Sequence, residues 1–529
     1  MVNEAGEARG LSGPPLATGD EDPGVEIETL WMSAAEEGRW ADLEMLADTR
    51  FFRDLLVNQP AVERALQLMP DERLHAHPRY LVARDLAHAR GRSLAMLTGI
   101  STQAYVRWVG AQQRPATRDV IAVLCAHIQD LNVLGRFAES AALVDEICVK
   151  VDEADDRDGF PDILPEVFIL GGLSKLLAGH RHEAAALFEE GYRWSRDWGW
   201  HPAGVHLGNM IALAHALCHD YVRAADAIAD WAGTRPHEPG VLADVYASVG
   251  ILARGLIAVG AVDLDGLDAV IAAVDEPIRQ SSLWWIAVHL VAQRALLSGN
   301  ARDGARELER TLTGHRSLSR PAAYAGEQLR ADLADLYEAS GDLAAAQDVL
   351  NTPGLSVHCG PMVDPLVRLE ILRGDQPRAE RHLDEALQRR GPRAPTYPSW
   401  EVLQLAISHM SVAAEPPADQ TEIAQLECLV RRTGAVNALV NAPSGLREAL
   451  SGRLGLPRVS TEVFPVPRVV QLTRREREVL EALHRYANAG DIAAALHISR
   501  NTAKTHMASV YRKLGVHTRQ QALKFAAKL

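Results

Sequence analysis

One phrase returns along this chain and limits what it can fold into. It consists of an apolar helix end, a glycine or polar turn, and a second helix with alanine at a fixed offset. Examples are LGRFAESAALV (134–144), LAGHRHEAAALF (177–188), LSGNARDGARELE (297–309), ASGDLAAAQDVL (339–350) and LRGDQPRAERHL (372–383). The turn positions of seven such phrases are Gly135, Gly179, Asp220, Gly260, Gly299, Gly341 and Gly374. Their successive gaps of 44, 41, 40, 39, 42 and 33 residues predict stacked helical hairpins.

The residue types in this phrase suit a hairpin of two close helices. Glycine reaches the left-handed conformation that ends the first helix, and alanine lets the second backbone approach. One hairpin cannot bury its apolar face alone, so the units are expected to stack into a solenoid over residues 25–450. The pattern resembles tetratricopeptide-like repeats, and the alternative is a compact irregular helical domain. The phrases at 36–47 and 88–97 fit less well and are interpreted as degenerate or capping units.

Aromatic residues gather in two segments of this region. Since solenoids form concave grooves that hold ligands or partner proteins, these aromatics are a candidate ligand pocket. The residues concerned are Trp194, Trp198, Trp200, Trp284 and Trp285. The competing interpretation is that they pack between hairpins.

Charge is distributed unevenly along the chain. The formal net charge is −14, yet residues 468–529 contain 12 basic and 4 acidic residues, and none of the acidic ones lies beyond Ser499. An acidic body with a cationic end predicts a polyanionic partner for that end, or else a solvated basic tail. The five cysteines show no metal-binding spacing and predict free thiols in a reducing, cytoplasmic compartment. No apolar segment suggests a signal peptide or a membrane span, and residues 1–24 are expected to be a disordered leader.

Signals of catalysis are scarce. The sequence contains no phosphate-binding GxxxxGK[ST] loop, no GxSxG and no HExxH. The histidine pairs His75/His77 and His180/His182 have i,i+2 spacing, which makes their side chains diverge on a helix. The sequence therefore predicts a protein that is not an enzyme, with no cofactor and no metal.

The last part of the chain follows a proline-containing linker at 451–470 and predicts four helices over residues 471–529. The first opens with a capping box of Thr473 and Glu476 and buries Val479, Leu480 and Leu483. The second covers about Ala489 to Leu496, with Ile492, Ala493 and Leu496 inward. Ser499 is the expected N-cap of the third, Arg500 to Leu514. Thr518 opens a fourth helix through Ala526.

The third of these helices has two different faces. Ala503, Met507, Val510 and Leu514 form one apolar stripe. The opposite stripe holds Asn501, Thr505, Ala508 and Arg512, with Lys504 beside it. Small, polar and cationic groups on one side suit a helix that enters the DNA major groove.

The segments LTRREREVLEAL (472–483) and IAAALHISRNTAKTHMASVYRKLGVHTRQQAL (492–523) resemble the C-terminal DNA-binding domain of LuxR-family bacterial transcription regulators. The resemblance implies that Lys504, Thr505 and Ala508 face base edges, with Asn501 available beside them. It places Arg500, Thr502, Arg512 and Lys513 near phosphates, and Val516, Ala522 and Ala526 where two copies pair on a palindromic site. Tyr486, Ala489–Gly490 and Ala503 depart from the family pattern.

These observations predict an all-α protein in which a helical-repeat sensor precedes a helix-turn-helix domain, similar to MalT-like regulators but without their ATPase module. The function expected is that of a cytoplasmic, sequence-specific transcription regulator, with activation implied by the resemblance. Its expected partners are double-stranded DNA, RNA polymerase, a second copy of the chain, and a small-molecule or protein effector, with no membrane. The alternatives are a repeat scaffold whose terminal bundle docks a protein, and an enzyme with an unrecognised helical active site.

Overall fold

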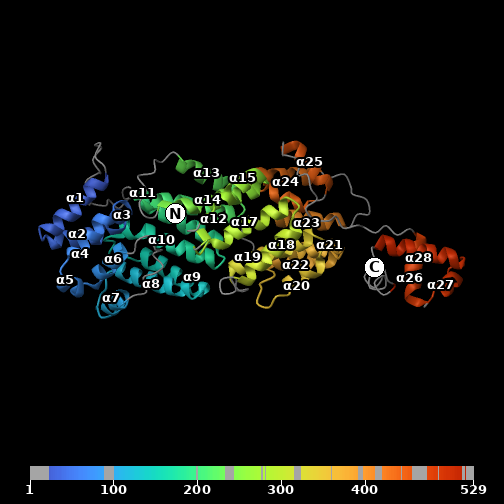
Figure 1. Cartoon of the computed structure of the whole chain (residues 1–529), viewed down its shortest axis with the longest axis horizontal. Helices are drawn as coiled ribbons and strands as arrows, with labels where there is room; N and C mark the ends of the chain where they lie inside the picture. Colours follow the sequence, from blue (N-terminus) through green and yellow to red (C-terminus); the bar gives the residue numbers. More distant parts are fainter. Residues whose placement is uncertain are drawn as a thin grey trace, which may run out of the picture. The chain divides into compact units, whose positions relative to one another are not determined.

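The computed structural model describes residues 23–88, 100–197, 201–232, 243–275, 278–279, 281–314, 323–358, 360–390, 397–410, 420–442, 444–454, 474–486, 488–514 and 519. Within these segments every regular element is a helix, which confirms the predicted all-α class. The chain divides into two compact units, Met1–Ile371 with Asp375–Pro465, and Leu372–Gly374 with Val466–Leu529 (Figure 1). Most of the expected leader and linker lies outside the described residues, although α1 already begins at Pro23.

The first helices of the larger unit surround a core of their own. Trp31, Leu43, Leu66 and Leu74 are fully buried there. The indole nitrogen Nε1 of Trp31 donates a 2.9 Å hydrogen bond to the buried carboxylate of Asp54. The helices are α1 (Pro23–Glu36), α2 (Trp40–Thr49), α3 (Phe51–Val57), α4 (Gln59–Leu68), α5 (Asp71–Ala76), α6 (Pro78–His88) and α7 (Ile100–Gly110).

Seven helix pairs follow, each an antiparallel hairpin of the predicted kind. They are α8 (Thr117–Val133) and α9 (Phe137–Asp152); α10 (Phe160–Leu177) and α11 (Arg181–Asp197); α12 (Ala203–Leu217) and α13 (Tyr221–Ala232); α14 (Ala243–Ala261) and α15 (Leu264–Ala273); α17 (Trp284–Leu297) and α18 (Ala301–Gly314); α19 (Tyr324–Ala339) and α20 (Leu343–Leu350); and α21 (Val363–Leu372) and α22 (Gln376–Arg390). The unit ends with α23 (Pro398–Met410), α24 (Gln420–Thr433), the 3₁₀ turn η3 (Val436–Asn441) and α25 (Ser444–Leu454).

One turn geometry joins the two helices of every pair. The residue two positions before the first residue of the second helix has a positive φ. The backbone amide of the next residue donates a hydrogen bond to the carbonyl of the residue five positions earlier. Gly135 has φ 71°, and the Arg136 amide donates to the Leu131 carbonyl at 2.8 Å. This C-cap provides hydrogen-bond donors for backbone carbonyls at the helix end that have no partner within the helix. The predicted turn glycines with positive φ, which confirm that part of the pattern, are Gly135, Gly179, Gly299, Gly341 and Gly374.

Two predicted turn positions are wrong. The left-handed residue is His219 (φ 61°) instead of Asp220, and Val262 (φ 58°) instead of Gly260. With these corrections the gaps become 44, 40, 43, 37, 42 and 33 residues. The backbone hydrogen bonds of the turn hold even a β-branched residue in this conformation, so a search for glycine alone misses it. Gly260 lies inside α14 instead, where a Cβ would come within 2.4 Å of the Tyr221 ring.

The small residue of the second helix also has the predicted role. The position five residues after each left-handed residue is buried, and it is fully buried alanine in four hairpins. In α18 the position is Gly304, where a Cβ would lie 2.5 Å from the Cβ of Ala295 in α17. The helices of that pair therefore contact each other almost backbone to backbone. The four alanines are Ala184, Ala224, Ala346 and Ala379.

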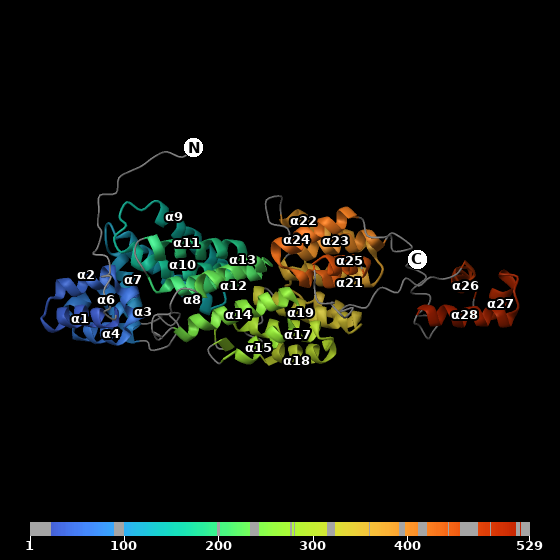
Figure 2. The same cartoon turned by 90° about the horizontal axis from the view of Figure 1, so that it is seen from above.

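The hairpins stack through their first helices. In chain order α10 contacts α12, α12 contacts α14, α14 contacts α17, and α17 contacts α19 (Figure 2). The phrase at 36–47 belongs to the same class, because Gly38 has φ 70° and the Arg39 amide donates to the Ala34 carbonyl at 2.9 Å. Most of the phrase at 88–97 lies outside the described residues.

The stack also makes contacts that a nearest-neighbour solenoid does not predict. Arg181, which begins α11, is buried and donates to the Leu217 carbonyl at 2.6 Å and to the Tyr397 hydroxyl at 2.9 Å. Its guanidinium lies 5.5 Å from the Tyr324 ring centroid and 5.1 Å from that of Tyr397. Residues 216 positions apart in sequence are thereby joined by a cation enclosed between two aromatic rings.

Candidate nucleic-acid interface

The smaller unit contains three described helices, α26 (Arg474–Arg485), α27 (Ala489–Ala495) and α28 (Arg500–Leu514). α28 packs against both of the others (Figure 2). The bounds of α28 agree with the predicted third helix. Of the predicted fourth helix only Arg519 is described. The shared core is Val479, Leu480, Ala482, Leu483, Ile492, Ala493, Ala503 and Val510. It includes the inward residues predicted for α26 and α27 except Leu496, which follows α27 and packs half-buried against this core.

Side-chain caps fix the path from α27 to α28. Asn488 accepts hydrogen bonds from the Gly490 and Asp491 amides, so α27 has a defined start despite the unusual Ala489–Gly490 pair. At its end His497 is left-handed (φ 53°), and the Ile498 amide donates to the Ala493 carbonyl at 2.9 Å. The hydroxyl of Ser499 then accepts a 3.1 Å bond from the Thr502 amide, which confirms it as the N-cap of α28.

A part-buried polar contact joins α28 to α26. The Ser509 hydroxyl donates a 2.8 Å hydrogen bond to the carboxylate of Glu476, which is 5% exposed. Ala503 and Val510, which face the core, are fully buried. Glu476 thus joins α26 to α28, a role the sequence did not reveal. Thr473, its predicted capping-box partner, lies outside the described residues.

Two arginines of this basic region serve the fold. The guanidinium of Arg475 donates to the Leu496 carbonyl at 2.6 Å and to Glu478 at 2.6 Å. Arg519 donates to the carbonyls of Leu483 and Tyr486 at the end of α26. Cations in these positions satisfy open carbonyls at helix C-termini. They explain part of the positive charge without nucleic acid.

The remaining polar groups lie on the outer face of α28. The exposed side chains, six of the eight predicted to meet DNA, are Arg500, Asn501, Thr502, Lys504, Thr505 and Ala508. The Thr505 hydroxyl donates to the Asn501 carbonyl at 3.0 Å, which orients the hydroxyl along the helix. Arg512 and Lys513 belong to α28, but their side chains lie outside the described part. The predicted pairing residues Val516, Ala522 and Ala526 also lie outside it.

This arrangement defines a class of domain. A short helix, a tight turn and a second helix with a small, acid-free outer face make a helix-turn-helix domain, whose second helix fits the major groove. Residues 470–526 match the family described as bacterial regulatory proteins, luxR family. The chain belongs to the luxR family of bacterial regulatory proteins.

Similar proteins share this segment. The chain is 41% identical over 90 residues to a probable transcriptional regulatory protein, SgaR, of Hyphomicrobium methylovorum, which covers 16% of this chain and 43% of that protein. It is 48% identical over 58 residues to the transcriptional regulatory protein YhcZ of Bacillus subtilis, covering 11% and 27%. It is 44% identical over 52 residues to the spore germination protein GerE of Bacillus subtilis, covering 10% and 70%. The chain therefore spans less than half the length of SgaR and YhcZ.

The described tryptophans of the candidate ligand pocket lie in different surroundings. Trp194 is half-buried against Phe160, with ring centroids 6.3 Å apart, and donates to Glu190 at 3.1 Å. Trp284 and Trp285 are buried, and Trp285 meets the edge of Tyr324 at 5.5 Å. Trp198 and Trp200 lie outside the described residues. These contacts favour packing as the role of the three described tryptophans.

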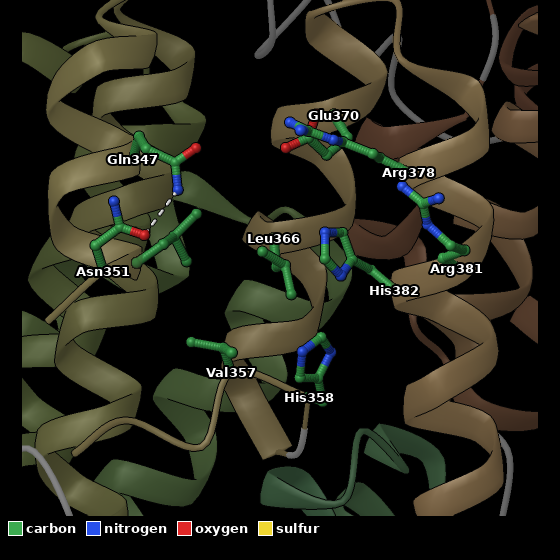
Figure 3. Close-up of a pocket in the computed structure, with 10 residues that line it drawn as sticks. Gln347, Asn351, Val357, His358, Leu366, Glu370, Arg378, Arg381 and His382 are labelled. Atoms are coloured by element: carbon green, nitrogen blue, oxygen red, sulfur yellow. Dashed lines mark hydrogen bonds between the residues drawn. The ribbon is translucent and has the colours of Figure 1, made fainter. Parts of the chain in front are cut away.

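A pocket of about 400 Å³ occurs elsewhere in the larger unit, between α20, the following loop, α21 and α22 (Figure 3). None of the candidate tryptophans lines it. Its lining includes His358, His382, Glu370, Arg378 and Arg381. Burial, together with the neighbouring His358, lowers the pKa of His382. The sequence did not point to this pocket because its residues come from four separate segments.

Among the helices of the described segments, none is both long enough and apolar enough to cross a membrane.

Proposed function

We propose that this chain is a sequence-specific, DNA-binding transcription regulator that reads the major groove with α28. The observation that carries the proposal is the two-sided character of this helix. Its inner face is held by Ala503, Val510 and the bond between Ser509 and Glu476, while its outer face presents only small, polar and cationic side chains. The names of similar proteins, SgaR and YhcZ among them, describe transcriptional regulatory proteins.

The outer face offers the chemistry that base recognition needs. The Lys504 ammonium donates to acceptors such as guanine O6 and N7, and the Asn501 amide both donates and accepts. The methyl groups of Thr505 and Ala508 are short enough to meet a thymine methyl group. Arg500 and Thr502 at the start of the helix suit phosphate contacts, and Arg512 and Lys513 extend this role toward its end.

The rest of the proposal concerns the whole chain. Two copies bind a palindromic operator and pair through Val516, Ala522 and Ala526. The bound dimer recruits RNA polymerase and activates transcription in the bacterial cytoplasm. The repeat unit carries no catalysis and holds a small-molecule or protein effector. The effector shifts the population between arrangements that can and cannot bind DNA.

Selection of bound fragments from genomic DNA by the full-length protein tests this function. We expect a recurring motif and an affinity that falls steeply with salt, because phosphate contacts release counterions. Lys504→Ala should reduce the preference for the selected site by about 1–3 kcal/mol per half-site. The control is Arg302→Ala on the exposed surface of α18, which removes the same charge.

Two outcomes would contradict the proposal. Selectivity that survives Lys504→Ala would show that the outer face of α28 has been misassigned. Absence of DNA retention, combined with salt-insensitive capture of a protein by the smaller unit, would support the scaffold function instead.

A further inference from the structure

Two histidines that line the pocket in Figure 3, His358 and His382, lie close to the carboxylate of Glu385. His358 lies in the loop before α21, and His382 and Glu385 lie three residues apart on one face of α22. The three side chains place one potential ligand atom each within 4.8 Å of one another. Among the described residues this is the group of histidine, cysteine and carboxylate side chains close enough together to hold a metal ion.

The distances suit a tetrahedral ion. With bonds of about 2.1 Å, neighbouring ligand atoms of a tetrahedral zinc site lie about 3.4 Å apart. The Nε2 atom of His358 is 3.3 Å from the Oε2 atom of Glu385. The centroids of the two imidazole rings are 5.2 Å apart, with the rings tilted by 34°. Because the Glu385 side chain is 50% exposed, it can adjust to close the remaining gap without disturbing the core.

The imidazoles also lack other partners. The Nδ1 atoms of His358 and His382 are buried and have no hydrogen-bond partner in the described part of the chain. Buried polar atoms are nearly always hydrogen-bonded, so the open Nδ1 atom of His382 calls for a bound species. His358 faces Glu385 through its Nε2 atom, so its Nδ1 atom is not the one that would bind the ion. Two imidazoles and one carboxylate are a donor set that Zn²⁺ uses when it keeps a fourth position open.

We propose that His358, His382 and Glu385 bind one Zn²⁺ ion, with a fourth coordination position open to the adjoining pocket. Arg378 and Arg381 line the same pocket and come from the same helix as His382 (Figure 3). The lining carries two arginines and one carboxylate, that of Glu370, so the fourth ligand that fits this net positive charge is an anion. The pocket thus takes a metal-bound small anion, such as a carboxylate.

This site goes beyond DNA recognition and does not rest on it. All three ligands lie in the larger unit, whereas α28 lies in the smaller one. A chain that binds DNA but not zinc would refute only the metal site. A chain that binds zinc but no DNA would refute only the proposed function.

The experiment uses the metal-free full-length protein, titrated with Zn²⁺ against a chromophoric chelator and then with Co²⁺ as a spectroscopic probe. We expect one equivalent of Zn²⁺ per chain and the visible absorption of tetrahedral Co²⁺. His358→Gln, His382→Gln and Glu385→Gln should each weaken binding at least about tenfold. Azide, a small anion, should shift the Co²⁺ spectrum by entering the open position.

His180→Gln is the matched control. His180, the residue before α11, contacts Glu183 at 3.0 Å with the same i,i+3 spacing, but Lys175 bonds that carboxylate at 2.7 Å. The His180→Gln variant should bind Zn²⁺ with the affinity of the wild type. The assignment is overturned if no stoichiometric binding occurs, or if all three ligand variants keep wild-type affinity. It is also overturned if the control loses binding as they do. A Co²⁺ spectrum that azide leaves unchanged refutes the open position. Circular dichroism of each variant separates loss of a ligand from loss of folding.

Discussion

Replacement of Gly260 by alanine sets two physical effects against each other. The residue lies in the last turn of α14, where helix propensity alone favours alanine over glycine by at most about 1 kcal/mol. The added Cβ would come within 2.4, 2.5 and 2.6 Å of three carbon atoms of the Tyr221 ring, whereas ordinary contact begins at 3.4 Å. One side must therefore move by about 1 Å. Overpacking of a core costs about 1–3 kcal/mol.

The Tyr221 ring has little room to move away from the added methyl group. Tyr221 is 5% exposed, its hydroxyl lies 3.3 Å from the His219 Nδ1 atom, and its Cβ neighbours Gly434. We therefore take the upper end of the overpacking range and expect Gly260→Ala to destabilise the repeat unit by about 2 kcal/mol after the propensity gain. Gly452→Ala is the control, because Gly452 is an exposed glycine of α25 and no atom lies within 4 Å of the place its added methyl group would take. It should stabilise the unit by about 0.5–1 kcal/mol.

Urea unfolding followed by tryptophan fluorescence measures both changes. All ten tryptophans lie at or before Trp400, so the signal reports on the larger unit only. In a Tyr221→Leu background, which removes the ring, Gly260→Ala should become neutral or stabilising. If its cost is the same there, the ring is not the cause. If Gly260→Ala stabilises the wild type, the close packing of α14 against Tyr221 is refuted.

Other regions of the chain give further predictions. Val262→Gly should raise the free energy of unfolding by about 0.5–1 kcal/mol in the same assay, because a β-branched residue is strained at φ 58°. Burial, reinforced by the charge of Asp162, raises the pKa of Glu166 to about 8, so the stability that its neutral form contributes is present below pH 4.5 and is lost as the pH rises toward 8. Glu166→Gln should flatten this dependence, with a gain on the order of 4 kcal/mol above pH 8, measured as urea midpoints from pH 4 to 9. Ser499→Ala should destabilise α28 by about 0.5–2 kcal/mol, seen as faster amide exchange, and Ser499→Asn should not. Arg500→Ala should lower the slope of log affinity against log salt by about 1 per half-site while keeping sequence preference, measured by fluorescence anisotropy.

Much of the candidate DNA interface could be predicted because its signals are local. The N-cap Ser499, the apolar stripe through Ala503 and Val510, and the bounds of α28 all follow from residues within one or two helical turns of each other. The bond between Ser509 and Glu476 could not be predicted, because it depends on how α26 crosses α28. For the same reason the sequence did not reveal that Arg475 and Arg519 bind carbonyls of the domain itself.

The repeat unit shows the same division. Five turn glycines were visible because a left-handed helix end favours glycine, and that preference acts within a single residue. His219 and Val262 were not predicted, because there the hydrogen bonds of the turn override the preference of these residues for a negative φ.

The sequence by itself determined the helices, their pairing into hairpins and the family of the terminal domain, since periodicity, capping and turn chemistry act over a few residues. Tertiary structure alone decided that Arg181 lies between Tyr324 and Tyr397, and that His358 meets His382 and Glu385. Such meetings depend on the angles at which successive hairpins stack. Those angles are set by many small packing contacts between helices, and no short stretch of sequence contains all the residues that make them.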